Sequence, residues 1–340
     1  PVSDLLVYIG EGTPNGSYYR NDFSTEIPKT INFDNVNTDV LLNRLSIKNN
    51  SLVLPEGTEY KILVLKNTEF ISLPTLKRIL EIANSGIPVV GVKPQKLAGY
   101  NQTEADKNEF SELQSQLSSI MEEDFSDWNT VLSNNKITPD LLVNNGEAID
   151  YIHRKTEQED IYFFFNADTS ATKTFDLSFR IANKIPELWN PMTGEIIKKA
   201  DFINEGNITK TSIKLDAGES VFVVFREASS NLETVTEFHE NIDFSLTSDN
   251  KISAKVLENG EYTMPLSSGK IWKTNVSDIP KPFKIEGSWD VTFNKASGYG
   301  GTVKFDSLID WKDHPKDSIN YYSGTATYKK TITIPENSLE

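Results

Sequence analysis

The stretch from Ser307 to Ser318 holds residue types with which proteins bind sugars. Trp311 lies there together with Asp310, Asp313 and His314. An indole ring can stack on the apolar face of a pyranose, while carboxylates and amides bind its hydroxyls. Because the stretch is polar and lies between strand-like segments, we expect a loop that contacts carbohydrate through Trp311, Asp313 and His314.

Adjacent acids elsewhere raise the question of hydrolysis. Inverting glycosidases need two carboxyl groups about 6.5–9.5 Å apart across a sugar subsite. Glu122, Glu123, Asp124 and Asp127 are neighbours in the sequence, but they follow an apolar helix pattern that ends at Met121. We interpret them as the solvated end of that helix and not as a catalytic pair.

Composition excludes several classes of function. The formal net charge is −15 over 340 residues, and no cluster of Lys and Arg is present, which argues against nucleic acid and anionic membrane surfaces as partners. The chain has no Cys and only three His, far apart, so disulfides, thiolate metal sites and His-based metal sites are not expected. No apolar run approaches the roughly 18 residues of a membrane span, so we expect no membrane insertion.

The first 154 residues alternate buried strands with helices. Helices are predicted from Pro74 to Gly86 and after the capping-box pattern Thr103–Asp106. Three short apolar runs are typical of strands buried on both faces of a parallel sheet: Leu5–Ile9, Lys61–Leu65 and Ile87–Val92. Strands separated by helices predict an α/β domain with a doubly wound parallel sheet at residues 1–154.

Near residue 155 the hydrophobic pattern changes to the period of two that half-buried strands show. Phe175, Leu177 and Phe179 alternate with polar residues, and no helix period appears between 155 and 227. We expect a small antiparallel β-sandwich at 155–228, a connector with short strands at 229–282, and part of a second sandwich at 283–340. Strands are predicted here at Ile252–Val256, Glu261–Met264, Trp289–Phe293 and Tyr321–Ile334.

Five segments, taken in order, resemble one family. They are Pro1–Glu11, Phe33–Leu41, Leu52–Leu65, Pro186–Gly194 and Tyr322–Tyr328. Their order and spacing resemble glycoside hydrolase family 106, the α-L-rhamnosidases, over most of residues 1–225 and 285–335. Phe33 and Asn35 stand where the family has two tyrosines. The last segment is also similar to the jelly-roll sugar-binding domain of family 2 enzymes.

The resemblance implies a multidomain fold, α/β followed by all-β. Residues 1–154 would form an amidotransferase-like (flavodoxin-like) domain, and 283–340 part of a galactose-binding-like jelly-roll. In the family the catalytic carboxylates lie in a preceding barrel, and a glutaminase would need a nucleophilic Cys that this chain lacks. We therefore expect the non-catalytic C-terminal portion of a hydrolase that cleaves α-L-rhamnosidic bonds in polysaccharides.

The same resemblance draws attention to Asp34 and Asn37. Both lie in a predicted loop before the helical pattern of Val40, Leu41 and Leu45. In the family such a loop can lie beside the sugar pocket of the barrel, where an Asp and an Asn could bind hydroxyls. The alternative is purely structural, an N-cap of the helix formed by Asn37 or Thr38.

Other interpretations remain open at this point. The chain could be a stand-alone carbohydrate-binding or assembly module, or an accessory part of a β-galactosidase or family 2-like enzyme. The expected partners are a rhamnose-containing glycan and the missing barrel of the same protein. We expect a periplasmic, secreted or cell-surface bacterial protein, and we predict no cofactor. Jelly-rolls often hold Ca²⁺, and calcium binding stays open here because the sequence shows no ligand set to which the ion can be assigned.

Overall fold

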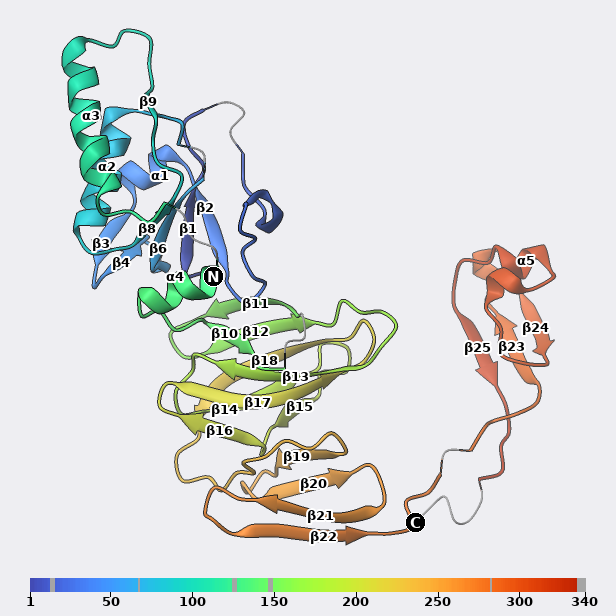
Figure 1. Cartoon of the computed structure of the whole chain (residues 1–340). Coiled ribbons are helices and arrows are strands. Elements are labelled where there is room, and N and C mark those ends of the chain that lie inside the picture. The colour runs from blue at the N-terminus through green and yellow to red at the C-terminus, as the bar shows by residue number, and fades with distance from the viewer. Residues whose placement is uncertain (13–15, 67, 124–126, 146–148, 282, 335–340) are drawn as a thin grey trace. The chain divides into compact units, whose positions relative to one another are not determined.

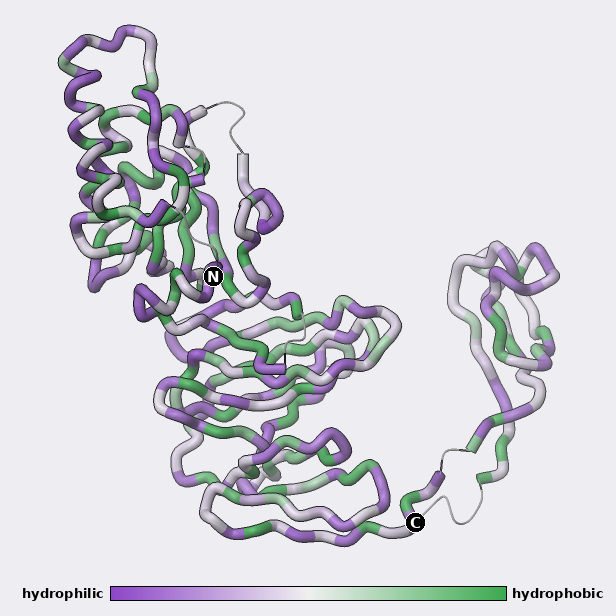
Figure 2. Tube along the Cα trace, viewed as in Figure 1, coloured by the Kyte–Doolittle hydropathy of each residue, from purple (hydrophilic) through white to green (hydrophobic). Residues whose placement is uncertain are grey.

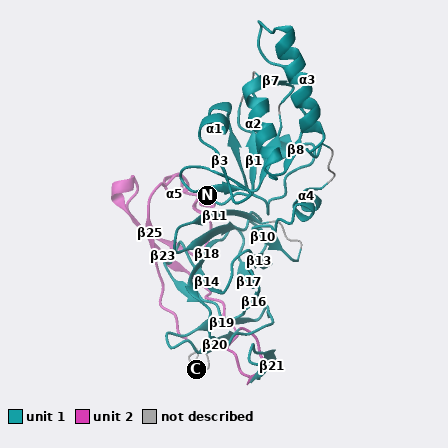
Figure 3. Ribbon diagram, turned by 90° about the vertical axis from the view of Figure 1, so that its left-hand side faces the viewer, with its two compact units in different colours: residues 1–256, 262–274 teal, residues 257–261, 275–340 magenta. Residues whose placement is uncertain are grey.

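The computed structural model describes residues 1–12, 16–66, 68–123, 127–145, 149–281 and 283–334. They belong to two compact units, residues 1–256 with 262–274 (unit 1) and residues 257–261 with 275–340 (unit 2; Figure 3). Strands outnumber helices in this described part of the chain (Figure 1). None of its helices is long and apolar enough to cross a membrane.

A four-stranded parallel sheet forms the first layer of unit 1, in the order β2-β1-β6-β8. The strands are β1 (Leu5–Tyr8), β2 (Phe33–Val36), β6 (Ile62–Leu65) and β8 (Val89–Gly91). Leu6 and Leu63 point into one hydrophobic cluster, and Leu5 and Ile62 into another on the opposite face. Both faces are therefore covered, as the continuous apolar runs predicted.

Helices cover the two faces of this sheet. The first cluster includes residues of α1 (Thr38–Asn43), α2 (Leu73–Asn84) and α3 (Glu104–Ser118), and the second includes residues of α4 (Trp128–Asn134). The predicted capping box at Thr103 and Asp106 is present. α3 buries only Phe110 and Leu117 and is largely hydrophilic in Figure 2. The remaining elements here are η1 (Arg20–Asp22), β3 (Ser46–Lys48), β4 (Ser51–Val53), β5 (Glu59–Tyr60), β7 (Phe70–Ile71) and β9 (Lys96–Leu97).

Two antiparallel sheets pack face to face in the middle of unit 1, in the orders β10-β13-β17-β16 and β11-β12-β18-β14-β15. The aromatic rings of Tyr162, Phe164 and Phe175 lie fully buried between them. The sandwich already starts at β10, ahead of the predicted change near residue 155. Its strands are β10 (Leu141–Val143), β11 (Asp150–Lys155), β12 (Asp160–Phe165), β13 (Lys173–Phe179), β14 (Lys184–Trp189), β15 (Ile196–Lys198), β16 (Phe202–Glu205), β17 (Ile208–Leu215) and β18 (Ser220–Ala228).

Four further strands follow the sandwich. They are β19 (Ile242–Leu246), β20 (Ile252–Val256), β21 (Gly260–Pro265) and β22 (Ile271–Val276), and they pair as two hairpins. Phe244 and Met264 share a hydrophobic cluster with Ala200 and Phe202 of the sandwich region. The segment predicted as a connector therefore shares a core with the sandwich.

Unit 2 contains a small antiparallel sheet in the order β24-β23-β25. Its elements are β23 (Trp289–Phe293), η2 (Lys295–Ser297), β24 (Gly301–Phe305), η3 (Trp311–Asp313), α5 (Asp317–Asn320) and β25 (Ala326–Lys329). The predicted strand at Tyr321–Ile334 is wrong except for β25. Tyr322 turns its ring into the core instead, and Ile332 and Ile334 are about 40% exposed with no strand pairing. Strand propensity depends on context, and within this stretch only Ala326–Lys329 has a neighbouring strand with which to pair.

Gly91 provides a test of the parallel sheet. Its φ is +110°, and a Cβ there would lie 2.3 Å from the carbonyl oxygen of Leu65, whereas Gly99 has a φ of +109° and open space around it. Alanine costs about 1–2 kcal/mol at either position because of the left-handed backbone. We expect Gly91→Ala to lower the free energy of unfolding in urea by about 1–3 kcal/mol more than Gly99→Ala. Equal losses would contradict the close approach of β8 to β6.

Candidate functional site

Asp34 and Asn37 belong to the edge of the parallel sheet, Asp34 inside the edge strand β2 and Asn37 directly after it. Asp34 is part of strand β2, so its predicted place in a loop is wrong; pairing with β1 satisfies its backbone. Its carboxylate accepts a hydrogen bond of 3.0 Å from the Tyr60 hydroxyl. Burial and the nearby carboxylate raise the pKa of Tyr60. This hydrogen bond links β2 to β5 inside the α/β layer.

Asn37 forms the N-cap of α1, one of the two roles that its sequence position allowed. Its side chain accepts a hydrogen bond from the backbone N–H of Val40 at 3.0 Å. Asn37 also lines a pocket of about 270 Å³ with Asn35 and Tyr60. This pocket adjoins the carboxyl ends of β1 and β2, the edge at which open α/β sheets bind ligands.

Trp311, Asp313 and His314 come together in one turn of unit 2, around η3. The indole Nε1 of Trp311 donates to the Tyr328 hydroxyl at 2.5 Å. The His314 ring stacks on Phe305 with centroids 4.9 Å apart, while Asp313 is exposed. Trp311 and His314 thus pack on the core of unit 2, and Asp313 is the most accessible of the three.

The adjacent acids after α3 have ordinary structural contacts. Glu123 pairs with Lys93 at 3.6 Å, and Asp127 caps α4 by accepting from the Thr130 N–H at 2.8 Å. The Thr130 hydroxyl donates to the same carboxylate at 2.9 Å. The two hydrogen bonds that Asp127 accepts from Thr130 lower the pKa of Asp127. Asp124 lies outside the described residues.

A buried ion pair that the sequence did not reveal joins the α/β layer to the sandwich. The Arg180 guanidinium, at the end of β13, donates to both carboxylate oxygens of Asp4 at 2.9 and 3.2 Å. Asp4 is 3% exposed and directly precedes β1. Arg180 also donates to the Thr138 carbonyl at 2.6 Å and lies 3.6 Å from Asp140. Burial raises the pKa of Asp4, and the Arg180 charge opposes that shift.

Asp140 continues this network into a buried histidine. His153 Nδ1 lies 2.9 Å from Asp140 Oδ2, and its Nε2 lies 3.3 Å from Asp160 Oδ1, an ion-pair distance without hydrogen-bond geometry. The Tyr162 hydroxyl donates to Asp140 at 3.1 Å, and the Lys184 ammonium reaches Asp160 at 3.1 Å. Burial alone would lower the pKa of His153, but the hydrogen bond to Asp140 and the charges of both aspartates outweigh it and raise this pKa.

We name these six residues the junction network: Asp4, Asp140, His153, Asp160, Arg180 and Lys184. Its carboxylates are bonded to cations or hydroxyls inside the fold, which suits a structural role. Among the described residues no group of three or more His, Cys, Asp or Glu is arranged to hold a metal ion. Sequence patterns could not find the network because Asp4 and Arg180 are 176 positions apart.

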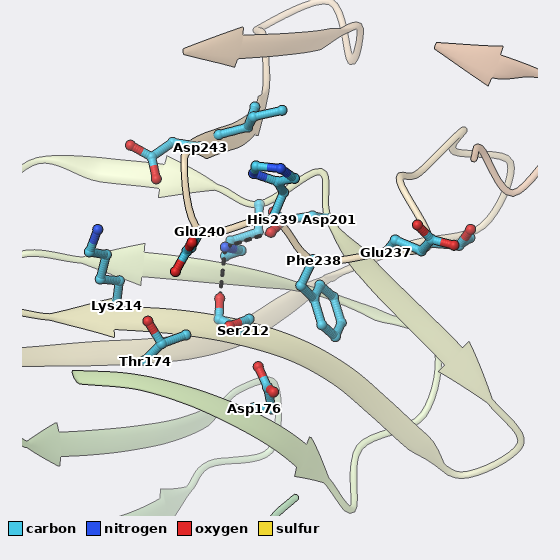
Figure 4. Close-up of a pocket in the computed structure, with 13 residues that line it drawn as sticks. Thr174, Asp176, Asp201, Ser212, Lys214, Glu237, Phe238, His239, Glu240 and Asp243 are labelled. Carbon is cyan, nitrogen blue, oxygen red and sulfur yellow. Dashed lines mark hydrogen bonds and ion pairs between the residues drawn. The ribbon is translucent and has the colours of Figure 1, made fainter. Parts of the chain in front are cut away.

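A cleft of unit 1 lies on the outer face of the sandwich (Figure 4). Its volume is about 710 Å³. Thr174 and Asp176 of β13 pair with Lys214 and Ser212 of β17, and these four side chains line one wall. The facing wall is the segment 236–243, which leads into β19.

Lys199 and Asp201 lie at the base of this cleft. The Lys199 ammonium donates to the Ser212 carbonyl at 2.8 Å and pairs with Asp201 Oδ2 at 3.0 Å. Asp201 is 4% exposed, and its Oδ1 has no hydrogen-bond partner in the described structure. Burial raises the pKa of Asp201, and Lys199 opposes the shift.

Removal of Arg180 tests the junction network. Arg180→Met would leave Asp4 and Asp140 buried without their cation, so we expect a loss of about 3–5 kcal/mol in the free energy of unfolding. Lys107→Met is the matched control, because Lys107 pairs with Glu104 at the surface at 2.7 Å and such pairs contribute about 0–1 kcal/mol. Urea denaturation measures both. Similar small losses would rule out the network as a major contact.

The pH dependence of stability tests His153. Its raised pKa means that the folded protein binds this proton more tightly than the unfolded chain does. This contribution is fully present below the unfolded pKa of about 6.5 and is lost as pH rises through the folded pKa. We expect the unfolding free energy to fall over this window, and the fall to vanish in His153→Gln but persist in His314→Gln. A flat wild-type profile would contradict the assignment.

Comparison with known proteins gives the family. The model of glycoside hydrolase family 106, described as alpha-L-rhamnosidase, matches residues 1–202. A Formosa agariphila protein named "Putative beta-glucuronidase" is 30% identical over 303 residues, which cover 86% of this chain and 23% of that protein. The structure of a rhamnosidase from Novosphingobium sp. PP1Y shares the fold, with a TM-score of 0.70 and 23% identity over 96% of this chain and 28% of the other. The chain thus spans about a quarter of each relative, and it belongs to glycoside hydrolase family 106.

Proposed function

We propose that this chain is the non-catalytic C-terminal portion of a bacterial glycoside hydrolase that cleaves α-L-rhamnosidic bonds in polysaccharides. The match of the family model to residues 1–202 carries this proposal. The catalytic general acid and the carboxylate that activates water would lie in a barrel outside these residues. The enzyme would act in the periplasm, at the cell surface or outside the cell, on a rhamnose-containing glycan.

The proposed modules follow the family pattern. The parallel sheet with helices on both faces supports an amidotransferase-like, flavodoxin-like domain at 1–154, and the three-stranded sheet of unit 2 supports a partial jelly-roll at 283–340. The sandwich would occupy 155–228 and the connector 229–282. Because β10 already belongs to the sandwich, the first boundary fits better before Leu141 than at 154.

The role proposed for this portion is mechanical support of the barrel. The junction network makes the α/β layer and the sandwich one body, which is what a support requires. Sugar contact by Asp34, Asn37, Trp311, Asp313 and His314 stays a prediction. Asn37, which lines the 270 Å³ pocket, and the exposed Asp313 offer the most accessible polar groups of the five.

A β-glucuronide is a second candidate substrate, because the Formosa agariphila relative carries that activity in its name. A stand-alone binding module is a second candidate role, favoured by the polar cleft of Figure 4. The cleft also contains carboxylates, the residue type that glycosidases use, so hydrolysis by this chain has a concrete location to test.

Incubation of the chain with 4-nitrophenyl α-L-rhamnoside and 4-nitrophenyl β-D-glucuronide separates these roles. We expect no release of nitrophenol above buffer from either substrate, and release of nitrophenol from the rhamnoside by a longer polypeptide that includes the barrel. Turnover by residues 1–340 that is lost in Glu240→Gln would move catalysis into the cleft and contradict the proposal. Circular dichroism of the variant would confirm that it folds.

A further inference from the structure

The cleft above Asp201 has the features of a binding site, and the family assignment does not predict such a site. Its two walls come from different parts of unit 1. Asp176 and Ser212 belong to the sandwich sheet, and Phe238 and Glu240 to the segment before β19. Figure 4 shows these labelled side chains around one common space. A volume of about 710 Å³ lies within the range of small-molecule pockets, about 300–1,000 Å³.

Asp201 indicates what a ligand must supply. Its Oδ2 is held by Lys199 at 3.0 Å, but Oδ1 receives no hydrogen bond from the described residues, although the residue is 4% exposed. A buried carboxylate oxygen without a donor is costly, and most such atoms in proteins are satisfied. Asp201 lines the cleft, but Oδ1 itself has less than 1 Å² of exposed surface, so its carboxylate must rotate toward the cleft to meet a ligand. A ligand that then donates a hydrogen bond to it would remove this cost. The ligand should therefore carry hydroxyl or amine groups.

The charge of the lining excludes anions. Five carboxylates face two ammonium groups in the cleft: Asp176, Asp201, Glu237, Glu240 and Asp243 against Lys199 and Lys214. A uronate, sulfate or phosphate would meet net repulsion at this surface. Metal ions are also disfavoured, because no metal-binding group of His, Cys, Asp or Glu is found in the described ranges.

Phe238 distinguishes a sugar from other donors. Its ring is half-buried in the lining, opposite the polar wall of β13 and β17. An aromatic face beside hydrogen-bond acceptors matches the two sides of a pyranose, whose C–H groups stack on the ring while its hydroxyls bind carboxylates. We propose that this cleft binds a neutral sugar unit, which donates a hydroxyl to Asp201 Oδ1 and stacks on Phe238. The site is independent of whether this chain has hydrolytic activity.

Histidine NMR can test the proposal on the intact chain, because only three His are present. His239 lines the cleft, His153 is buried in the junction network, and His314 lies in unit 2. Titration with methyl α-L-rhamnopyranoside and methyl β-D-galactopyranoside should shift the ring signals of His239 and leave those of His153 and His314 in place for at least one of the two sugars. The sugars are added up to about 100 mM, so that even weak binding would be detected. The proposal would be overturned if the His239 signals shift with neither sugar.

Variants and charged probes sharpen the result. Phe238→Ala should weaken the binding of the sugar about fivefold, whereas Phe165→Ala, an exposed Phe outside the cleft lining, should not change it. Asp201→Asn should also weaken binding, and Phe238→Ala decides the matter if that variant does not fold. Unchanged binding in Phe238→Ala, or binding of methyl β-D-glucuronide or spermidine in place of the neutral sugars, would refute the neutral-sugar site.

Discussion

The burial of Asp4, Asp140 and Asp160 is the constraint on which unit 1 depends. Three carboxylates with 3–4% exposure cannot stay charged inside a protein without cations beside them. The cations are Arg180 and Lys184 at either end of the turn after β13, with His153 on β11 between the carboxylates. Because Asp4 precedes β1 and its partner belongs to the sandwich, satisfying these charges fixes the two layers to one another.

This constraint explains a second feature of the fold. The backbone follows the same seam, since the Val2 N–H donates to the His153 carbonyl at 3.1 Å and the Tyr151 hydroxyl donates to the Thr30 carbonyl at 3.0 Å. The Lys29 ammonium reaches Asp150 at 2.9 Å nearby. Contacts of three kinds, ionic, backbone and hydroxyl, therefore cross from the segments that precede β1 and β2 to β11. In the proposed role as a support for a further domain, such a seam would hold the two layers of unit 1 together.

Local patterns predicted the elements whose burial or capping shows in neighbouring residues. The apolar runs at β1, β6 and β8 indicated strands because burial on both faces leaves no polar positions, and the capping box at Thr103 depends on residues three positions apart. The strands Ile252–Val256 and Trp289–Phe293 occur where they were predicted, since period-two alternation reports a half-buried face.

Features that depend on distant partners could not be predicted in this way. Asp34 is in a strand because β1 offers hydrogen bonds, although its own sequence is polar. Tyr321–Ile334 has the sequence of a strand, but only Ala326–Lys329 finds a neighbour. The junction network and the cleft above Asp201 combine segments far apart in the chain, and nothing in any one segment indicates its partner. The candidate sugar residues were chosen by type, whereas their contacts depend on packing that only the structure shows.

Native-state hydrogen exchange of an Asp4→Asn variant tests most directly whether the two layers form one body. The substitution lies in the α/β layer, so the informative amides are those of β12 and β18 in the sandwich, compared with those of β6. If the layers are coupled through Asp4 and Arg180, protection will fall in β12 and β18 as well as in β6, by similar free energies of opening. A loss of protection limited to β6, with the sandwich amides unchanged, would contradict the account.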